Sequence, residues 1–264
     1  MELFDSHVHL DSPRFRDDLP EVIERAHQAG VKRMVSCGSD WGTSEWNATL
    51  AAETVGVYAA VGVHAHSALS AVGDPTSVPL EIDGLARIAE LASQHAVVAI
   101  GEIGLDYHYD FAPRPVQRAV LSYQLELAAD LDMPVILHNR ESDEDMRDIV
   151  DGVGAGLRGV LHCFTSNASM AQWAVARGLY LGVAGPVTFR KSEALASVLR
   201  DVPLTSLLVE TDCPWLAPHP HRGTRNEPAY VKLVMERLSA ILDLPAAMVA
   251  QATTENACRL FGLP

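Results

Sequence analysis

Eight short apolar segments, separated by longer amphipathic stretches, constrain the fold of this 264-residue chain more than any other feature. Each segment is short enough for a β-strand, and most are apolar throughout, as expected for parallel strands buried on both faces. The predicted strands are residues 3–9, 33–37, 57–63, 97–103, 135–138, 159–163, 179–183 and 207–211. Helix-like segments between them include residues 19–29, 80–95, 115–131, 193–199 and 228–242.

Eight strand–helix units in a chain close to ~250 residues are typical of a closed barrel rather than an open sheet. The sequence therefore predicts an α/β fold of the (β/α)8 TIM-barrel type. No Gly/Ser linker or low-complexity tract divides it, so we expect one domain over residues 1–264. Segments 67–79 and 214–225 are predicted loops after the third and eighth strands, and the acidic stretch 141–151 is predicted to be a short solvated helix. In a barrel, loops that follow strands build the active-site face.

The balance of charge limits the partners. Thirty-four acidic residues against twenty basic ones give a formal net charge of −14, which repels a bare phosphate backbone. Broad, non-specific binding to nucleic acid is therefore not expected, and any contact with nucleic acid must be local.

The distribution of cysteines and apolar residues bears on location. Four cysteines lie far apart without a C-x-x-C pair, so we expect small buried residues in a reducing compartment. The N-terminal residues are too charged for a signal peptide, and no apolar run approaches ~18 residues. We therefore expect a cytoplasmic protein without a membrane segment, and no obligate protein partner is evident.

Residues able to bind metal or move protons recur where the predicted strands end. Because the carboxyl ends of barrel strands meet at one mouth, we expect these side chains to lie on the same face. They are His7, His9, His64, Glu102, His138, His162 and Asp212.

His7 and His9 form an H-x-H pair on the first predicted strand. Side chains two apart on a strand point to the same face and start roughly 6.6 Å apart, so both imidazoles can reach one ion. An H-x-H pair alone is more typical of partly buried structural histidines than of metal ligands. Glu102, His138 and His162 repeat the pattern of an apolar strand ending in a possible ligand. A buried, unpaired carboxylate such as Glu102 is costly unless it is neutralised or coordinated.

Asp212 ends the last predicted strand and could both ligate a metal and accept a proton from water. Glu210 has the same parity, so it either orients a ligand or pairs with an arginine. Four histidines and two carboxylates exceed the needs of one tetrahedral ion and suit two divalent ions, with Glu102 as the natural bridge. None of the three lysines ends a predicted strand, which argues against a carbamylated lysine as the bridge.

Eight motifs along nearly the whole chain resemble the TatD family of metal-dependent hydrolases, within the amidohydrolase-like barrels. They are D-S-H-V-H-L-D at 5–11, G-V-H-A-H at 62–66, G-E-I-G-L-D-Y at 101–107, P-V-I-L-H-N-R at 134–140, L-H-C-F at 161–164, E-T-D-C-P-W-L-A-P at 210–218, H-R-G-T-R-N-E-P at 221–228 and T-T-E-N-A-C-R-L-F at 253–261. Ala65 departs from the pattern, because many relatives have proline between the two histidines.

The resemblance implies a barrel, divalent-metal dependence and phosphodiester hydrolysis, usually as a deoxyribonuclease acting 3′ to 5′ on single strands. The family's metal positions correspond to His7, His9, Glu102, His138, His162 and Asp212. Histidine-rich sites are typical of zinc, manganese or iron, whereas the family is commonly assayed with magnesium. We expect two divalent ions and a single-stranded DNA or short oligonucleotide substrate.

In this hypothesis Asp212 and Glu102 are the catalytic residues. Residues that could grip the phosphate, leaving group or terminal base are His64, His66, Tyr107, Arg140, Arg222 and Arg225. For the arginines, a surface or carboxylate-paired role is an equal alternative, and for Tyr107 it is packing at the mouth. Two alternative functions stay open at this point: a metal-dependent ester or amide hydrolase such as a D-aminoacyl-tRNA deacylase, and a non-catalytic binding protein on a barrel scaffold.

Overall fold

The computed structural model of the chain describes residues 1–77, 82, 85–154 and 156–264. Its strands form one eight-stranded sheet over the described residues, in the order β1-β2-β3-β4-β5-β6-β7-β8. The pairs β1–β2, β3–β4, β4–β5 and β7–β8 are parallel, and Val8 of β1 forms a parallel bridge with Cys213 after β8. The first and last strands thus lie side by side, which confirms the predicted TIM-barrel class.

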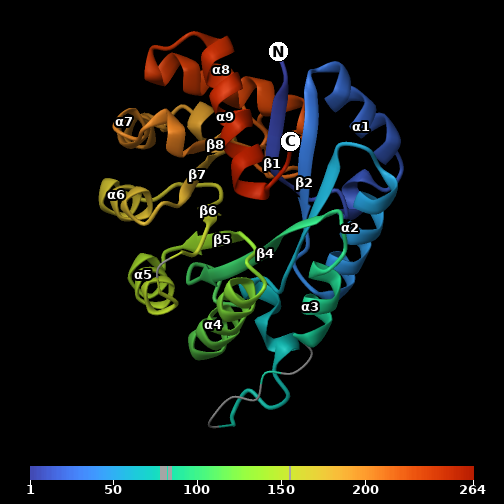
Figure 1. Ribbon diagram of the computed structural model, residues 1–264. Coiled ribbons are helices and arrows are strands. Elements are labelled where there is room, and N and C mark those ends of the chain that lie inside the picture. The colour runs from blue at the N-terminus through green and yellow to red at the C-terminus, as the bar shows by residue number, and fades with distance from the viewer. Residues whose placement is uncertain (78–81, 83–84, 155) are drawn as a thin grey trace. The chain divides into compact units, whose positions relative to one another are not determined.

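Helices alternate with the strands along the chain (Figure 1). The strands are β1 (Leu3–Val8), β2 (Val31–Cys37), β3 (Val57–Val61), β4 (Val97–Asp106), β5 (Val135–Arg140), β6 (Gly159–Leu161), β7 (Tyr180–Val183) and β8 (Leu207–Val209). The α-helices of the described residues are α1 (Leu19–Gln28), α2 (Trp41–Glu53), α3 (Ala86–Ala92), α4 (Arg114–Asp130), α5 (Asp143–Gly152), α6 (Ala168–Ala176), α7 (Glu193–Arg200), α8 (Val231–Leu242) and α9 (Ala246–Phe261).

All eight predicted strands are present, and their starts agree within two residues. The main difference is β4, which is ten residues long and continues to Asp106. All ten of its residues are buried, so the strand keeps its apolar environment on both faces.

The predicted helices 19–29, 115–131, 193–199 and 228–242 correspond to α1, α4, α7 and a short 3₁₀ turn followed by α8. Most of the acidic stretch 141–151 lies in α5, which runs from Asp143 to Gly152. Of the predicted helix 80–95, residues 80, 81, 83 and 84 lie outside the described residues, and α3 covers Ala86–Ala92. The predicted loop 67–79 likewise extends into undescribed residues at 78 and 79. Helices α2, α6 and α9 were not singled out by the sequence pattern.

The chain divides into two compact units, Met1–Ser36 with Leu161–Pro264, and Cys37–Val160. In the first unit, α9 packs on β1 and β8, and α8 lies beside it (Figure 1). Phe4 of β1 and Phe261 of α9 meet with ring centroids 5.8 Å apart. This apolar contact fixes β1, the strand that carries His7, against the C-terminal helix.

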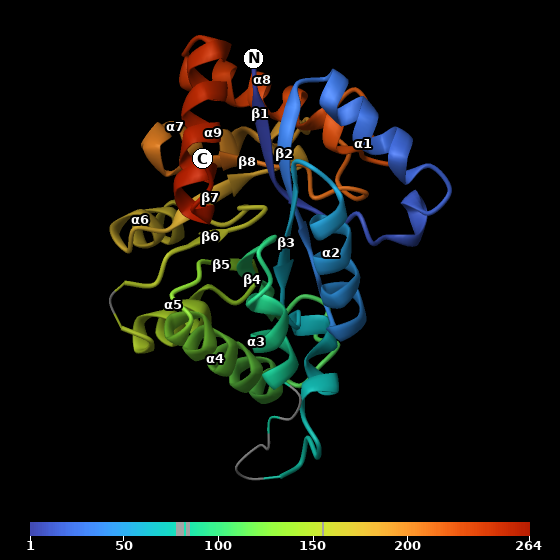
Figure 2. The same ribbon diagram turned by 45° about the vertical axis from the view of Figure 1, so that its right-hand side comes forward.

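In the second unit, α2 packs on β3, and α4 lies against β4 and beside α5 (Figure 2). Two buried glutamines of α4 hold the strand ends. The side-chain amide of Gln124 accepts from Val63 N and donates to Val63 O, next to His64. That of Gln117 bonds to both backbone groups of Asp106. A helix outside the sheet thereby fixes the ends of β3 and β4, where the polar side chains begin.

Candidate metal centre

The first unit brings His7, His9, His162 and Asp212 together. Nε2 of His7 lies 3.0 Å from Nε2 of His9, and Oδ1 of Asp212 lies 3.8 Å and 3.5 Å from these two nitrogens. The rings of His7 and His162 stack with centroids 4.0 Å apart. Donor atoms of His7, His162 and Asp212 lie within 4.8 Å of one another. We call these four residues the aspartate cluster.

Backbone pairing between β1 and the segment after β8 builds this cluster. Asp212 N donates to His7 O, and His9 N donates to Cys213 O. Asp212 itself adopts a left-handed conformation, with φ 54°. A non-glycine residue in this conformation is strained by about 1–3 kcal/mol, and such strain is concentrated at functional sites.

Buried acceptors surround the aspartate cluster. Glu210 is fully buried; it accepts from Cys163 N at 2.5 Å and from Ser6 Oγ at 3.1 Å, and its Oε1 lies 3.5 Å from Nδ1 of His162. These partners support the alternative in which Glu210 orients a ligand. Asp5, which the sequence pattern did not single out, accepts from both N and Oγ1 of Thr211.

The charge state of Asp212 follows from its neighbours. Burial raises the pKa of this carboxyl, but the hydrogen bond with His9 and the nearby His162 and His7 outweigh it, so the pKa lies below the ordinary value of 3.8. Asp212 is therefore ionised at neutral pH, as a metal ligand or general base must be.

The second unit brings His64, Glu102 and His138 together, which we call the glutamate cluster. Oε1 of Glu102 lies 3.3 Å from Nε2 of His64 and 2.9 Å from Nδ1 of His138. His64 and Glu102 are buried, and His138 is half-buried. His64, predicted as a substrate contact, thus lies among the possible ligands of this cluster.

Asp106, at the end of β4, organises the surroundings of the glutamate cluster. Its Oδ2 lies 2.8 Å from Nε2 of His66 and 3.3 Å from Nε2 of His138. Burial raises its pKa, but these histidines and the N–H of Tyr109 lower it well below the ordinary range. A carboxylate on the outer nitrogen of a metal-binding histidine is a recurring arrangement that fixes the ring. The predicted strand ended at residue 103, so the strand pattern did not place Asp106 in this site.

Both clusters fit a divalent ion. With ligand bonds of about 2.0–2.2 Å, neighbouring donors around a tetrahedral ion lie about 3.3–3.6 Å apart. The donor spacings of 3.0 and 3.5 Å in the aspartate cluster and of 2.9 and 3.3 Å in the glutamate cluster are close to this range. Burial lowers the pKa of His64 from 6.5 to about 4, so its imidazole is neutral at pH 7 and has a lone pair to donate. Histidine and carboxylate donors together suit zinc, manganese or iron.

Besides His64 and His66, two more of the predicted substrate contacts, Tyr107 and Arg140, belong to the second unit. Arg140 is exposed, and its guanidinium lies over the ring of Tyr109, 4.9 Å from the centroid. The ring of Tyr107 is covered by Arg114 at 4.3 Å, and its hydroxyl donates to Asp145. Burial and this hydrogen bond raise the pKa of Tyr107 well above 10. Tyr107 therefore packs against its neighbours in the way that the alternative hypothesis described.

Arg222 and Arg225, in the first unit, both have protein partners. The Arg222 guanidinium lies 3.6 Å from the ring centroid of Phe189. Arg225 donates to Asp18 at 2.6 and 2.7 Å and to Glu227 at 2.8 Å. The contacts of Arg225 agree with the carboxylate-paired alternative.

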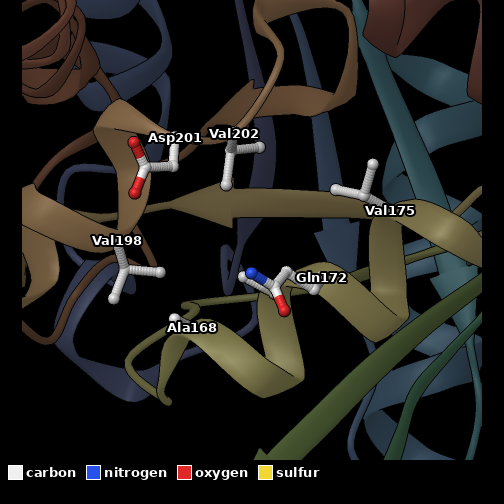
Figure 3. Close-up of a pocket in the computed structure, with 7 residues that line it drawn as sticks. Ala168, Gln172, Val175, Val198, Asp201 and Val202 are labelled. Atoms are coloured by element: carbon white, nitrogen blue, oxygen red, sulfur yellow. The ribbon is translucent and has the colours of Figure 1, made fainter.

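A further pocket of the first unit is lined by residues of α6 and by residues at and just after the C-terminal end of α7 (Figure 3). Its lining is mostly apolar, with Gln172 and Asp201 as the polar side chains. No predicted site residue is among those that line it.

A (β/α)8 barrel with histidine and carboxylate clusters near its strand ends is typical of metal-dependent hydrolases. The family model described as TatD related DNase matches residues 4–262. The chain therefore belongs to the TatD family, and it is an enzyme of the metal-dependent hydrolase class.

Relatives span the chain almost completely. The "uncharacterized metal-dependent hydrolase YabD" of Bacillus subtilis is 42% identical over 98% of this chain and 98% of that protein. The "3′-5′ ssDNA/RNA exonuclease TatD" of Salmonella typhimurium is 35% identical over 98% of each. The crystal structure of YJJV, a TatD homologue from Escherichia coli, superposes on this chain with a TM-score of 0.87. The two sequences are 30% identical, and the match covers 99% of this chain and 98% of that one. Among the helices of the described residues, none is long and apolar enough to cross a membrane.

Proposed function

We propose that this enzyme hydrolyses phosphodiester bonds at the 3′ ends of single-stranded DNA and uses two divalent ions to activate water. The observation that carries the proposal is the pair of donor sets, His7, His162 and Asp212 in one unit and His64, Glu102 and His138 in the other. Each set has the chemistry of a divalent-metal site.

When bound, divalent ions lower the pKa of water and neutralise charge on the phosphoryl oxygens. The chain's own groups then divide the work. Asp212, ionised and in a left-handed conformation just after β8, orients the attacking water and accepts its proton. Glu210 faces Nδ1 of His162 and Asp106 contacts Nε2 of His138, so that each carboxylate helps to orient one ring. The hypothesis that Glu102 bridges both ions stays a prediction.

Two observations support nucleic acid as the substrate. Relatives from Salmonella and Shigella are named 3′-5′ ssDNA/RNA exonucleases. Arg140 is exposed at the end of the strand that carries His138, where its charge can reach a phosphate. The net charge of −14 favours recognition of a strand end over a duplex gripped along its length.

The test supplies one purified preparation with two substrates. Single-stranded DNA labelled at the 5′ end should be shortened progressively from the 3′ end, and this shortening should require added divalent ions. D-aminoacyl-tRNA is the second substrate. Deacylation without any shortening of the DNA would replace this proposal with the ester-hydrolase alternative.

A further inference from the structure

Two large aromatic side chains of the second unit are exposed directly after β4. Tyr109 is 50% exposed and Phe111 is 62% exposed. Their rings stack, with centroids 5.4 Å apart and an angle of 18° between the planes. Single exposed apolar residues are common on protein surfaces, whereas adjacent exposed aromatic rings more often mark a contact site. We call Tyr109 and Phe111 the aromatic platform.

Positively charged and polar groups border the aromatic platform. The guanidinium of Arg140 lies 4.9 Å from the ring centroid of Tyr109. His66 meets both rings edge-on, with centroid distances of 5.6 Å to Tyr109 and 4.8 Å to Phe111. The nearby acids are paired, Asp110 with Arg114 and Glu141 with His108. The platform therefore combines flat apolar faces with an exposed cation.

The backbone beneath the platform is fixed. Oδ1 of Asp106 accepts from the N–H groups of His108 and Tyr109 at 3.0 and 2.9 Å. Buried Gln117 donates to the carbonyls of Asp106 and Ala112. The backbone that carries the rings is thus fixed before any ligand arrives, which lowers the entropy cost of binding.

Short contacts join the platform to the glutamate cluster. Asp106 touches both His66 and His138 through Oδ2. The rings of His64 and His66 lie 4.4 Å apart. One imidazole, that of His66, therefore separates the exposed rings from the metal-binding side chains.

We propose that Tyr109 and Phe111 form a stacking subsite for an unpaired nucleobase, in which Arg140 contacts the adjoining phosphate. Stacking on aromatic rings accepts any base, because every base has a π-face, and a paired base in a duplex does not offer that face. The subsite would select single strands without reading their sequence. This inference rests on the proposed function for its turnover assay but not for its binding assay.

The nucleobase is favoured over an apolar protein partner by size and charge. The platform consists of two rings bordered by a cation and an imidazole, whereas protein interfaces need a much larger apolar patch. Tyr107, which the sequence suggested for stacking, has its ring covered by Arg114. The two aromatic residues that follow it are exposed.

The test compares wild type with Phe111→Ala, Phe111→Trp and, as matched control, Tyr123→Ala, an exposed aromatic of the same unit on α4. The probe is a fluorescent single-stranded oligonucleotide, intact or with abasic residues at its three 3′-terminal positions. Anisotropy gives Kd, and shortening of the oligonucleotide gives KM and kcat.

We expect Phe111→Ala to weaken binding of the intact oligonucleotide about tenfold, while Phe111→Trp and Tyr123→Ala stay near wild type. On the abasic probe, wild type and Phe111→Ala should bind alike. Equal affinity of wild type and Phe111→Ala for the intact probe would overturn the subsite, and so would no binding by wild type. Binding that depends on Phe111 without any shortening would support the subsite and count against the nuclease proposal.

Discussion

Oε1 of Glu210 lies 3.5 Å from Nδ1 of His162, and both side chains are buried. The carboxylate also accepts from Cys163 N and Ser6 Oγ, so its position is set from three directions. Nδ1 of His162 therefore faces a carboxylate whose position is fixed. A carboxylate behind a histidine ligand also raises the basicity of the ring.

Replacing Glu210 by Gln should therefore weaken metal binding more than it changes the fold. We expect a 10- to 100-fold loss of affinity for the activating ion, because the charge behind His162 is removed. Isothermal titration with zinc or manganese gives the affinity, and turnover at saturating metal should largely recover. The matched control is Glu236→Gln on the surface of α8, which should bind metal as wild type does. Unchanged affinity in Glu210→Gln would remove the orienting role.

Gly182 gives a second approach to the same carboxylate. A Cβ at this position would lie 2.4 Å from Oε2 of Glu210, so Gly182→Ala must displace Glu210. We expect the same loss of metal affinity, with a lower melting temperature as well. Gly152→Ala is the control, because its Cβ meets no atom within 4 Å.

Asp212→Asn tests the proposed general base. The amide keeps the shape of the side chain but cannot take a proton from water, so we expect turnover to fall at least 10³-fold. Circular dichroism and the melting temperature should show a folded protein. Turnover close to that of wild type would exclude Asp212 from this role.

Removal of metal should affect both activity and stability. Extensive dialysis against a chelator is expected to abolish turnover and to lower the melting temperature, because ions that bind only the native state stabilise it in proportion to their occupancy. Adding back single metals, with the bound ions counted by elemental analysis, identifies the active ion. Full activity after complete removal of metal would contradict the assignment of this enzyme to the metal-dependent hydrolases.

The lowered pKa of Asp18 makes part of the free energy of unfolding depend on pH. Hydrogen bonds from Arg225 and Arg25 lower its pKa from 3.8 to about 2 against the opposing effect of burial. Because the folded pKa lies below the unfolded one, this stabilisation is complete above pH about 4 and is lost as the pH falls toward 2. We expect Asp18→Asn to cost about 1 kcal/mol at pH 7, discounted for the partial exposure of the pair.

Urea unfolding of Asp18→Asn and wild type at several pH values measures this difference. It should shrink between pH 4 and pH 2. Asp17→Asn, on the exposed neighbouring residue, should stay within about 0.5 kcal/mol of wild type throughout. A constant difference down to pH 2 would mean that Asp18 stabilises the fold without its charge.

The dependence of KM on salt tests the size of the contact with nucleic acid. The acidic chain favours a short stretch near the strand end, so few phosphates should be neutralised. We expect the plot of log KM against log salt to have a slope of about 2 or less. A steep slope would indicate a backbone gripped over many nucleotides.

The apolar strand pattern predicted most of the fold and most of the residues that form the two clusters. A strand's parity and its end are local properties, and so His7, His9, Glu102 and Asp212 could be located without tertiary information. Partners distant along the chain could not be predicted. Arg225 bonds to Asp18, 207 positions away, and no local pattern distinguishes a paired arginine from a free one.

The length of β4 shows the same limit. The pattern ended this strand at residue 103, whereas pairing with β5 continues to Asp106 and Arg140. Gly104, with φ +150°, makes this possible, because a Cβ there would lie 2.0 Å from His138 O. The carboxylate of Asp106 thus belongs to the strand, and its contacts with His66 and His138 follow from a register that the sequence alone does not reveal.

Strand β4 and the loop that follows it differ in how far their sequences can change during evolution. Inserting or deleting one residue among the ten buried positions of β4 would turn either Glu102 or Asp106 to the opposite face of the sheet relative to the rest of the strand, so its length is closed to variation. The loop that follows, with Tyr109 and Phe111, can change length and composition at little cost in stability. Descendants of this chain can therefore exchange one substrate for another while inheriting the same hydrolytic chemistry.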